Sequence, residues 1–143
     1  MRRRILWVLV CVFACMSPQV YAEELVVIVN ADSGVEKLSR DEVINIFMGR
    51  YRKLPNGATA MPLDIDGESD ERREFYRQLI GKSLPEVNAY WARLVFSGKT
   101  AAPADLATQR QVLERVARDP NAIGYVERKN LNRNVKVVYA LGE

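Results

Sequence analysis

An unbroken apolar run, LVVIVN from Leu25 to Asn30, constrains the fold of this chain more than any other stretch. A strand with one face in water alternates polar and apolar residues, whereas a continuous run rich in valine and isoleucine indicates a strand buried on both faces. Both faces of its sheet must then be covered by other elements. We therefore expect an interior strand here, with helices packed around the sheet.

Helix start and stop signals are well marked along the chain. In SRDEVINIFMG, Ser39 and Glu42 form a predicted capping box, and Gly49 is the stop. Ser83 and Glu86 repeat this pattern at the start of SLPEVNAYWARLVFSG. Further helices are expected after Ser69 and over TQRQVLERVARDP. The predicted apolar stripe of the helix after Ser83 is Val87, Tyr90, Trp91, Leu94 and Val95.

Extended segments alternate with these helices. A turn at residues 55–57 precedes a strand expected to end near Ile65, and AIGYV and VKVVYA read as two more strands. In AIGYV, Gly124 is expected to allow close backbone approach. The pattern predicts an α/β domain, with residues 23–143 as its single globular unit.

Residues 1–22 have the composition of a secretory signal peptide. Three arginines precede an apolar run from Ile5 to Met16, whose 12 residues fall short of the roughly 20 that span a bilayer. Cleavage is expected after Ala22, which predicts a periplasmic protein. A lipoprotein attached at Cys15 is the alternative, and the bulky Phe13 argues against it.

Removing this leader changes the charge and the cysteine content. Three of the 21 Lys and Arg residues lie in it, which leaves 18 against 18 Asp and Glu. A mature chain without net charge lacks the electrostatic footprint of a nucleic-acid-binding protein. Both cysteines also lie in the leader, so the mature domain has no disulfide and depends on burial alone.

The composition also removes most catalytic and metal-binding constellations. The sequence has no histidine, which excludes Ser-His-Asp and Cys-His machinery and most zinc sites. Asp64 and Asp66 would alternate onto one face of a strand, but such a pair is common without any catalytic role. DIDGESDE has the acidic spacing of a calcium loop, yet its Gly is at the fourth position and Phe75 at the twelfth. We predict no enzyme activity, no cofactor and no metal.

The stretch DIDGESDERREFYRQL, residues 64–79, poses the main functional question. A strand ends near Gly67, Ser69 is placed to cap a helix, and the first N–H groups of such a helix often bind an oxyanion. However, Asp70 and Glu71 occupy the first turn, where a carboxylate is stabilised by the helix dipole and repels an incoming anion.

Several strings together resemble a known family: LSRDEVINIFMGRYRKLPNG, PLDIDGESDERREFY, YWARLVFSG and NAIGYV. Their order is similar to the second lobe of the phosphate-type periplasmic substrate-binding proteins of ABC transporters. The resemblance covers roughly residues 26–138. It implies a single lobe of a type II periplasmic-binding-protein-like fold, a mixed sheet flanked by about four helices.

Two departures from the family pattern matter. Family members hold their ligand between two lobes, whereas 121 mature residues provide about one lobe. In the family's Ser-Gly-Thr helix start, Ser69 keeps the serine, while Asp70 replaces the glycine and Glu71 the threonine. The resemblance therefore implies a binding module in which phosphate or another oxyanion is disfavoured.

We expect a small ligand, if one binds, to lie beyond the strand ends at a helix start. The alternative is a periplasmic protein-interaction or sensory module that partners a membrane transporter or sensor protein or associates with itself. The candidate ligand-binding residues are Asn30, Asp66, Gly67, Ser69 and Arg72.

Overall fold

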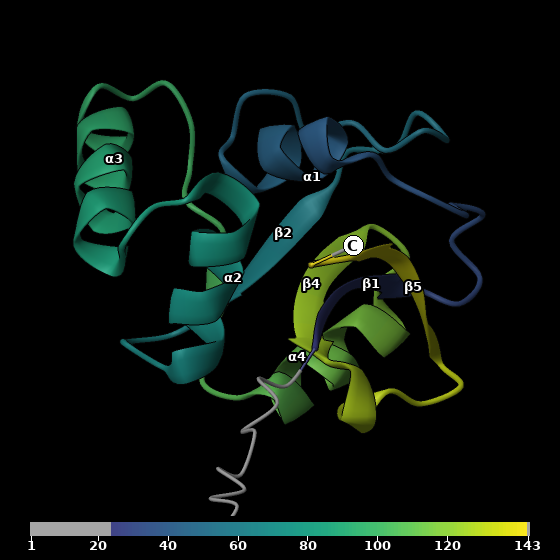
Figure 1. Ribbon diagram of the computed structural model, residues 1–143. Coiled ribbons are helices and arrows are strands. Elements are labelled where there is room, and N and C mark those ends of the chain that lie inside the picture. The colour runs from purple at the N-terminus through teal and green to yellow at the C-terminus, as the bar shows by residue number, and fades with distance from the viewer. Residues whose placement is uncertain (1–23, 143) are drawn as a thin grey trace, which may run out of the picture.

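The computed structural model describes residues 24–142, so the predicted signal peptide lies outside the described residues. Figure 1 shows the arrangement of the helices and strands. In chain order they are β1 (Leu25–Asn30), α1 (Arg40–Phe47), β2 (Met61–Ile65), α2 (Asp70–Ile80), α3 (Leu84–Phe96), β3 (Ala104–Leu106), α4 (Gln109–Arg118), β4 (Ala122–Glu127), the 3-10 turn η1 (Arg128–Asn130) and β5 (Val135–Ala140).

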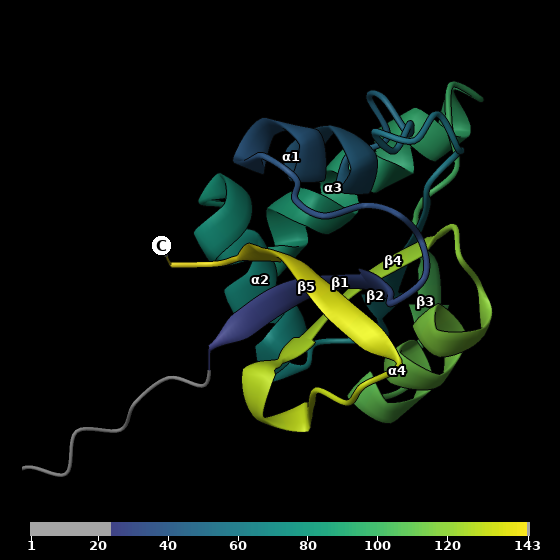
Figure 2. The same cartoon turned by 90° about the vertical axis from the view of Figure 1, so that its right-hand side faces the viewer.

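The strands form one mixed five-stranded sheet in the order β3-β2-β4-β1-β5. β1 pairs antiparallel with β4 and with β5, and Figure 2 shows β1 and β5 side by side. β2 pairs parallel with β3 and with β4. The apolar run of β1 thus has a partner on each side and is fully buried, which confirms the predicted interior strand and the mixed sheet.

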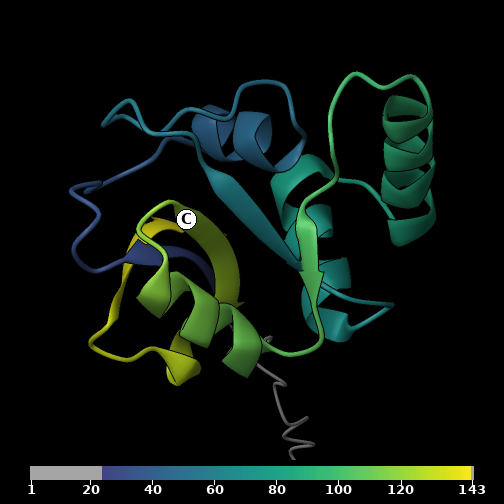
Figure 3. The same cartoon turned by 180° about the vertical axis from the view of Figure 1, so that it is seen from behind.

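Helices cover both faces of this sheet, and neighbouring residues of β4 show which helix covers which face. A Cβ built on Gly124 would lie 2.5 Å from Cγ1 of Val112 on α4, so this side chain packs directly on the β4 backbone at the glycine. Figure 3 shows α4 lying across this side of the sheet. The next residue, Tyr125, points the other way and stacks on Phe75 of α2, with ring centroids 3.8 Å apart. α1 lies on this second side, where Phe47 meets the same tyrosine edge-on.

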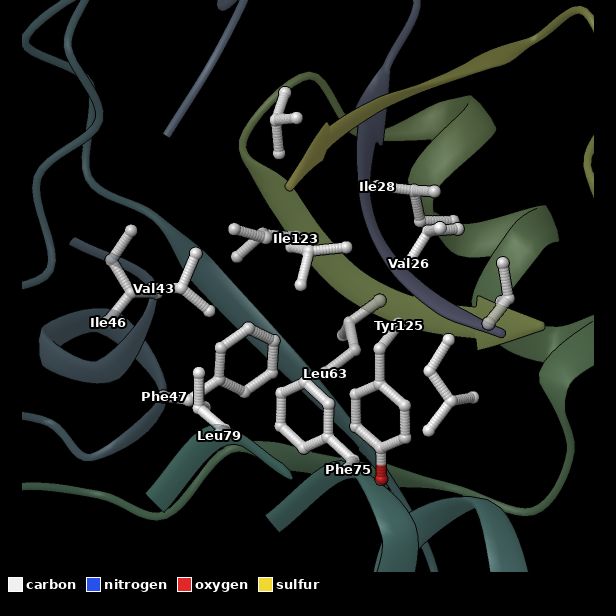
Figure 4. Packing of buried hydrophobic residues seen from close by; sticks show 14 of the residues in the cluster. Val26, Ile28, Val43, Ile46, Phe47, Leu63, Phe75, Leu79, Ile123 and Tyr125 are labelled. Carbon is white, nitrogen blue, oxygen red and sulfur yellow. The ribbon is translucent and has the colours of Figure 1, made fainter. Parts of the chain in front are cut away.

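The core is densest between α1, α2 and the sheet. Figure 4 shows Phe47, Phe75 and Tyr125 together among aliphatic side chains of β1, β2 and β4. All three rings are fully buried. Large aromatic groups in offset or edge-on contact are among the strongest contributors to a core, which explains how a domain without disulfides stays folded here.

Both predicted capping boxes are present. Ser39 accepts a hydrogen bond from the backbone of Glu42, and Glu42 accepts from the backbone of Ser39. Ser83 and Glu86 do the same at α3. These signals depend only on residues three apart, so they can be recognised in the sequence.

Three details differ from the expectations. The short edge strand β3 was not anticipated, because its three residues ADL show no strand-like pattern. Val95, expected on the inner stripe of α3, is 52% exposed. Asp66 lies beyond the end of β2 at Ile65, so it does not share a strand face with Asp64.

Among residues 24–142, no helix is long and apolar enough to cross a membrane.

Candidate ligand-binding site

The turn at the carboxyl end of β2 brings together most of the predicted site residues. The backbone N–H of Asp66 donates to the carbonyl of Leu106 at 2.8 Å, which ties the turn to the end of β3. Gly67 has φ 75°, a left-handed conformation that favours glycine. Ser69 then caps α2 by accepting from the backbone N–H of Arg72 at 3.2 Å. The predicted helix start is confirmed, and its hydroxyl oxygen already has a partner within the chain.

Asp64 lies beneath this turn as a buried carboxylate with its hydrogen-bonding capacity filled. The hydroxyl groups of Tyr76 and Tyr125 donate to it at 2.6 and 2.5 Å. The backbone N–H of Ile65 donates at 2.8 Å, and Nε of Arg72 at 3.3 Å. A buried charge is tolerated when it is paired and hydrogen-bonded in this way.

Arg72 points inward rather than toward the solvent at the helix start. Besides Asp64, its guanidinium donates to the carbonyl of Gly67 at 3.1 Å and to Oδ1 of Asn88 at 3.1 Å. Its side chain is only 11% exposed. Arg72 therefore braces the turn from below, and its charge is already matched by that of Asp64.

Burial changes the acidity of the groups around Asp64. Desolvation, reinforced by the adjacent Asp64 carboxylate, raises the pKa of Tyr76 and of Tyr125 well above the usual tyrosine range. Both phenols are therefore held as neutral hydrogen-bond donors. Partial burial, and then the charge of Asp64, also raises the pKa of Asp105 on β3.

The first turns of α2 and α4 lie next to each other, and a carboxylate of the chain itself lies between them. Oε1 of Glu71, in the first turn of α2, accepts from Nε2 of Gln109, the first residue of α4, at 3.0 Å. Oε1 of Gln109 in turn accepts from the backbone N–H of Glu127 at 2.8 Å and from Nδ2 of Asn130 at 2.9 Å. The polar groups at this end of the sheet are thus linked to one another.

Asp70 behaves differently from Glu71. Its carboxylate is 99% exposed and pairs with Arg73 at 2.7 Å on the helix surface. The helix start therefore has one carboxylate directed toward α4 and one in solvent. Both contribute negative potential where an oxyanion would approach the N–H groups of α2.

The structure does not bring Asn30 to this turn. In β4, Ile123 pairs with both Val29 of β1 and Pro62 at the start of β2, so Asn30 lies at the opposite end of the sheet from Gly67. Its Nδ2 donates to the carbonyls of Val116 and Ala117, each at 3.0 Å. Asn30 thus satisfies the C-terminal end of α4, whereas Asp66, Gly67, Ser69 and Arg72 lie together.

Sequence reasoning did not identify Asp64, Tyr76 and Tyr125 as one cluster. The feature of the sequence that could have revealed this cluster is Asp64, an acidic residue inside the otherwise apolar strand PLDI. A buried carboxylate requires hydrogen-bond donors nearby. Which donors meet it depends on tertiary packing. Within residues 24–142, no group of three or more Asp, Glu, His or Cys side chains is arranged to hold a metal ion.

The fold of this chain is similar to one lobe of solved substrate-binding proteins of the phosphate ABC transporter type. One similar solved structure is a putative phosphate ABC transporter substrate-binding protein with bound phosphate from Clostridium perfringens, with TM-score 0.66 and 17% identity over 81% of this chain. Others are an ABC-type phosphate transport receptor from Vibrio cholerae, with TM-score 0.63 and 14% identity over 81% of this chain, and PstS from Borrelia burgdorferi, with 0.62 and 12% over 82%.

The match covers 44%, 45% and 47% of those three proteins, so this chain spans less than half of their length. No protein-family model matches the chain. No curated protein matches it either. At these identities the comparisons establish the fold, which confirms the single-lobe architecture that the sequence resemblance implied.

Proposed function

We propose that this chain is an exported, non-catalytic binding module of the substrate-binding-protein type, which contacts its ligand at the turn Asp66–Ser69 and does not hold phosphate tightly. The contact of Glu71 with Gln109 is the observation that carries this proposal. It places a carboxylate of the chain between the starts of two helices, where an oxyanion would otherwise gain from the helix dipoles.

Electrostatics supports the exclusion of phosphate. Two like charges about 4 Å apart repel by about 4 kcal/mol at an effective dielectric constant of 20, and about 1.4 kcal/mol corresponds to a tenfold change in affinity. Arg72 cannot offset this repulsion, because its guanidinium is buried against Asp64. Arg73 pairs with Asp70 at the surface, so the nearest cations are already matched.

Titration calorimetry with inorganic phosphate at low salt tests this proposal. The wild-type protein should bind phosphate more weakly than about 10 μM, and Asp70→Gly/Glu71→Thr should bind at least about tenfold more tightly than the wild type. Asp32→Asn/Asp41→Asn removes two exposed carboxylates elsewhere and should leave the phosphate affinity unchanged. Wild-type affinity tighter than about 10 μM, or no gain in the first variant, would contradict the charge argument.

The leader suggests where the protein is located, and the structural similarity suggests which partners it has. The leader at residues 1–22 favours export to the periplasm. The similar solved proteins are described as phosphate transport components, which supports a membrane transporter or sensor protein as the partner of this lobe. Expression with and without the leader, followed by cell fractionation, tests the location.

A protein-interaction module is the second candidate, and one observation favours it. Phe96, at the end of α3, is 96% exposed, and the adjacent Val95 is 52% exposed. Neighbouring exposed apolar side chains are a feature of interaction surfaces. Sedimentation analysis of the wild type and of Phe96→Ser would detect self-association through this end of α3, and identical monomeric behaviour of both would remove the self-associating form of this candidate.

A further inference from the structure

A concave region lies at the C-terminal end of α2, away from the turn Asp66–Ser69. It is a cavity of about 480 Å³ between α1, the C-terminal end of α2, and α3. Pockets that bind small organic molecules have volumes of about 300 to 1,000 Å³. Its size is therefore appropriate for a ligand of that class.

Two long-range hydrogen bonds fix the walls of this cavity. Nη2 of Arg40, on α1, donates to the carbonyl of Leu79 at 2.5 Å and so connects α1 to the last turn of α2. The hydroxyl of Tyr90, on α3, donates to the carbonyl of Met48 at 2.7 Å and so connects α3 to the end of α1. All four residues line the cavity, which is consequently preformed by the fold.

The interior and the rim of the cavity differ in chemistry. Ile44, Leu79, Ile80 and Val87 give it apolar walls, and Leu79 and Val87 belong to the buried core. Four cationic side chains also line it: Arg40, Arg50, Lys82 and Arg93. A body of low polarity would contact the apolar walls, while a negative group would face the cations.

The single carboxylate of the lining does not cancel this positive charge. Oε2 of Glu86 accepts from the backbone N–H of Ser83 at 2.8 Å, within the capping box of α3. Nζ of Lys82 lies 4.0 Å from the other carboxylate oxygen of Glu86, Oε1. Within residues 24–142, the guanidinium groups of Arg50 and Arg93 have neither a hydrogen bond nor an ion pair. Two cations at the cavity are thus unmatched by the fold.

We propose that this cavity is a binding site for a free organic anion with an apolar, ring-sized body and a carboxylate, sulfonate or phosphate head. The body would occupy the space between Ile44, Ile80 and Val87, and the head would pair with Arg50 and Arg93. Guanidinium groups suit such heads, because their planar donors match two oxygen atoms at once. The site is separate from the turn Asp66–Ser69 and does not depend on the function proposed there.

A matched pair of fluorescent probes tests both halves of this proposal on the full exported protein. Anilinonaphthalene sulfonate has the apolar body and the anionic head, and N-phenylnaphthylamine has the same body without the head. We expect one saturable site for the sulfonate, and at least about tenfold weaker binding of the neutral amine, which corresponds to one lost charge-assisted contact.

Variants connect the binding to this cavity. Arg50→Gln/Arg93→Gln should weaken sulfonate binding at least about tenfold and leave the amine unaffected. Arg118→Gln/Arg133→Gln removes the same charge from exposed positions outside the cavity and should bind the sulfonate like the wild type. Ile44→Trp, which fills the apolar space, should weaken both probes, and thermal melting of each variant verifies that it is folded.

Three results would overturn the proposal. The first is equal affinity of the folded wild type for both probes. The second is unchanged sulfonate affinity in Arg50→Gln/Arg93→Gln. The third is loss of the sulfonate site in Phe96→Ala, because that result would place the probe on the exposed end of α3 instead.

Discussion

The regions around the two ends of α2 use their charged residues in opposite ways. At the N-terminal end, Arg72 lies buried against Asp64 and the turn, and Glu71 bonds to Gln109. At the C-terminal end, Arg50 and Arg93 line a cavity without any partner among the described residues. The charged groups near one end of α2 therefore hold the fold together, whereas the cations of neighbouring elements near its other end remain available to a ligand.

This difference shows why a residue type alone does not identify a binding site. Ser69 and Arg72 have the chemistry expected of an oxyanion site, but the fold already uses the Ser69 hydroxyl oxygen as a cap and the Arg72 guanidinium as a brace. A site requires groups that the native structure leaves unmatched. Substitutions and pH changes around both ends of α2 test where that boundary lies.

Asp64→Ala should have the largest effect. It leaves Arg72 without its buried partner, and the hydroxyl groups of Tyr76 and Tyr125 without an acceptor. Removing one member of a buried pair typically costs about 3 to 5 kcal/mol. Urea denaturation should show a loss of this size in the free energy of unfolding. Arg50→Gln/Arg93→Gln provides the comparison, and should change stability by no more than about 0.5 kcal/mol.

Equal stability of these two variants would contradict the assigned roles. A small effect of Asp64→Ala would mean that water replaces the carboxylate without cost. A large effect of Arg50→Gln/Arg93→Gln would mean that the fold uses those cations after all.

The second-largest effect is expected at alkaline pH, which should destabilise the region around the N-terminal end of α2. The folded protein raises the pKa of Tyr76 and Tyr125 above 10, chiefly through burial. The unfolded chain therefore loses these protons first, so their stabilising effect is complete below pH of about 10 and declines as the pH rises further. The expected loss is roughly 1 to 2 kcal/mol between pH 10 and 11, at up to about 1.4 kcal/mol per pH unit for each tyrosine.

Chemical denaturation at a series of pH values measures this slope. Tyr76→Phe removes one of the two phenols and should reduce the slope by about half, although the variant is less stable at neutral pH. A slope identical to that of the wild type would show that Tyr76 ionises equally in both states.

The parts of this structure that the sequence predicted well are those set by neighbours in the chain. The capping boxes at Ser39 and Ser83 each depend on a residue three positions away, and both are present. The interior position of β1 follows from its own apolar composition. Local signals of this kind need no knowledge of the tertiary structure.

The remaining features depend on contacts distant in sequence. Tyr125 is 61 residues from Asp64, so no local pattern connects them. Asn30 ends a strand, as Ile65 does, but β1 runs antiparallel to β4 whereas β2 runs parallel to it. The two strand ends therefore lie at opposite ends of the sheet, a relation that only the topology determines. The cavity with its unmatched cations likewise arises where three helices meet.

Ser69→Ala tests whether the hydroxyl at the helix start serves the fold. Loss of the bond from the backbone N–H of Arg72 should cost about 1 kcal/mol, within the range of about 0.5 to 2 for such caps. Ser83→Ala, at the start of α3, is the matched comparison because its hydroxyl has the same role. Both variants should show a similar decrease in melting temperature. An unaltered melting temperature for Ser69→Ala alone would mean that the Ser69 hydroxyl is not needed as a cap and is free to bind a ligand.

The smallest effect is expected for the ion pair between Glu74 and Arg77, which lies on the solvent-exposed surface of α2. Hydrogen bonds from Arg77 and Gln78 lower the pKa of Glu74 from 4.5 to about 2. The stabilisation from this shift is present above pH 4.5 and is lost as the pH falls toward 2. Because the pair is partly exposed, it contributes only a few tenths of a kcal/mol, roughly as for other surface pairs.

An NMR titration of the Glu74 carboxyl carbon measures this pKa directly. Arg77→Gln should move it back toward 4.5, while Arg93→Gln on α3 should leave it unchanged. An unchanged pKa in Arg77→Gln would remove Arg77 from the matched cations of α2. Arg77 would then be a cation without a partner, like Arg50 and Arg93. Cations available to a ligand would in that case not be confined to the region around the C-terminal end of α2.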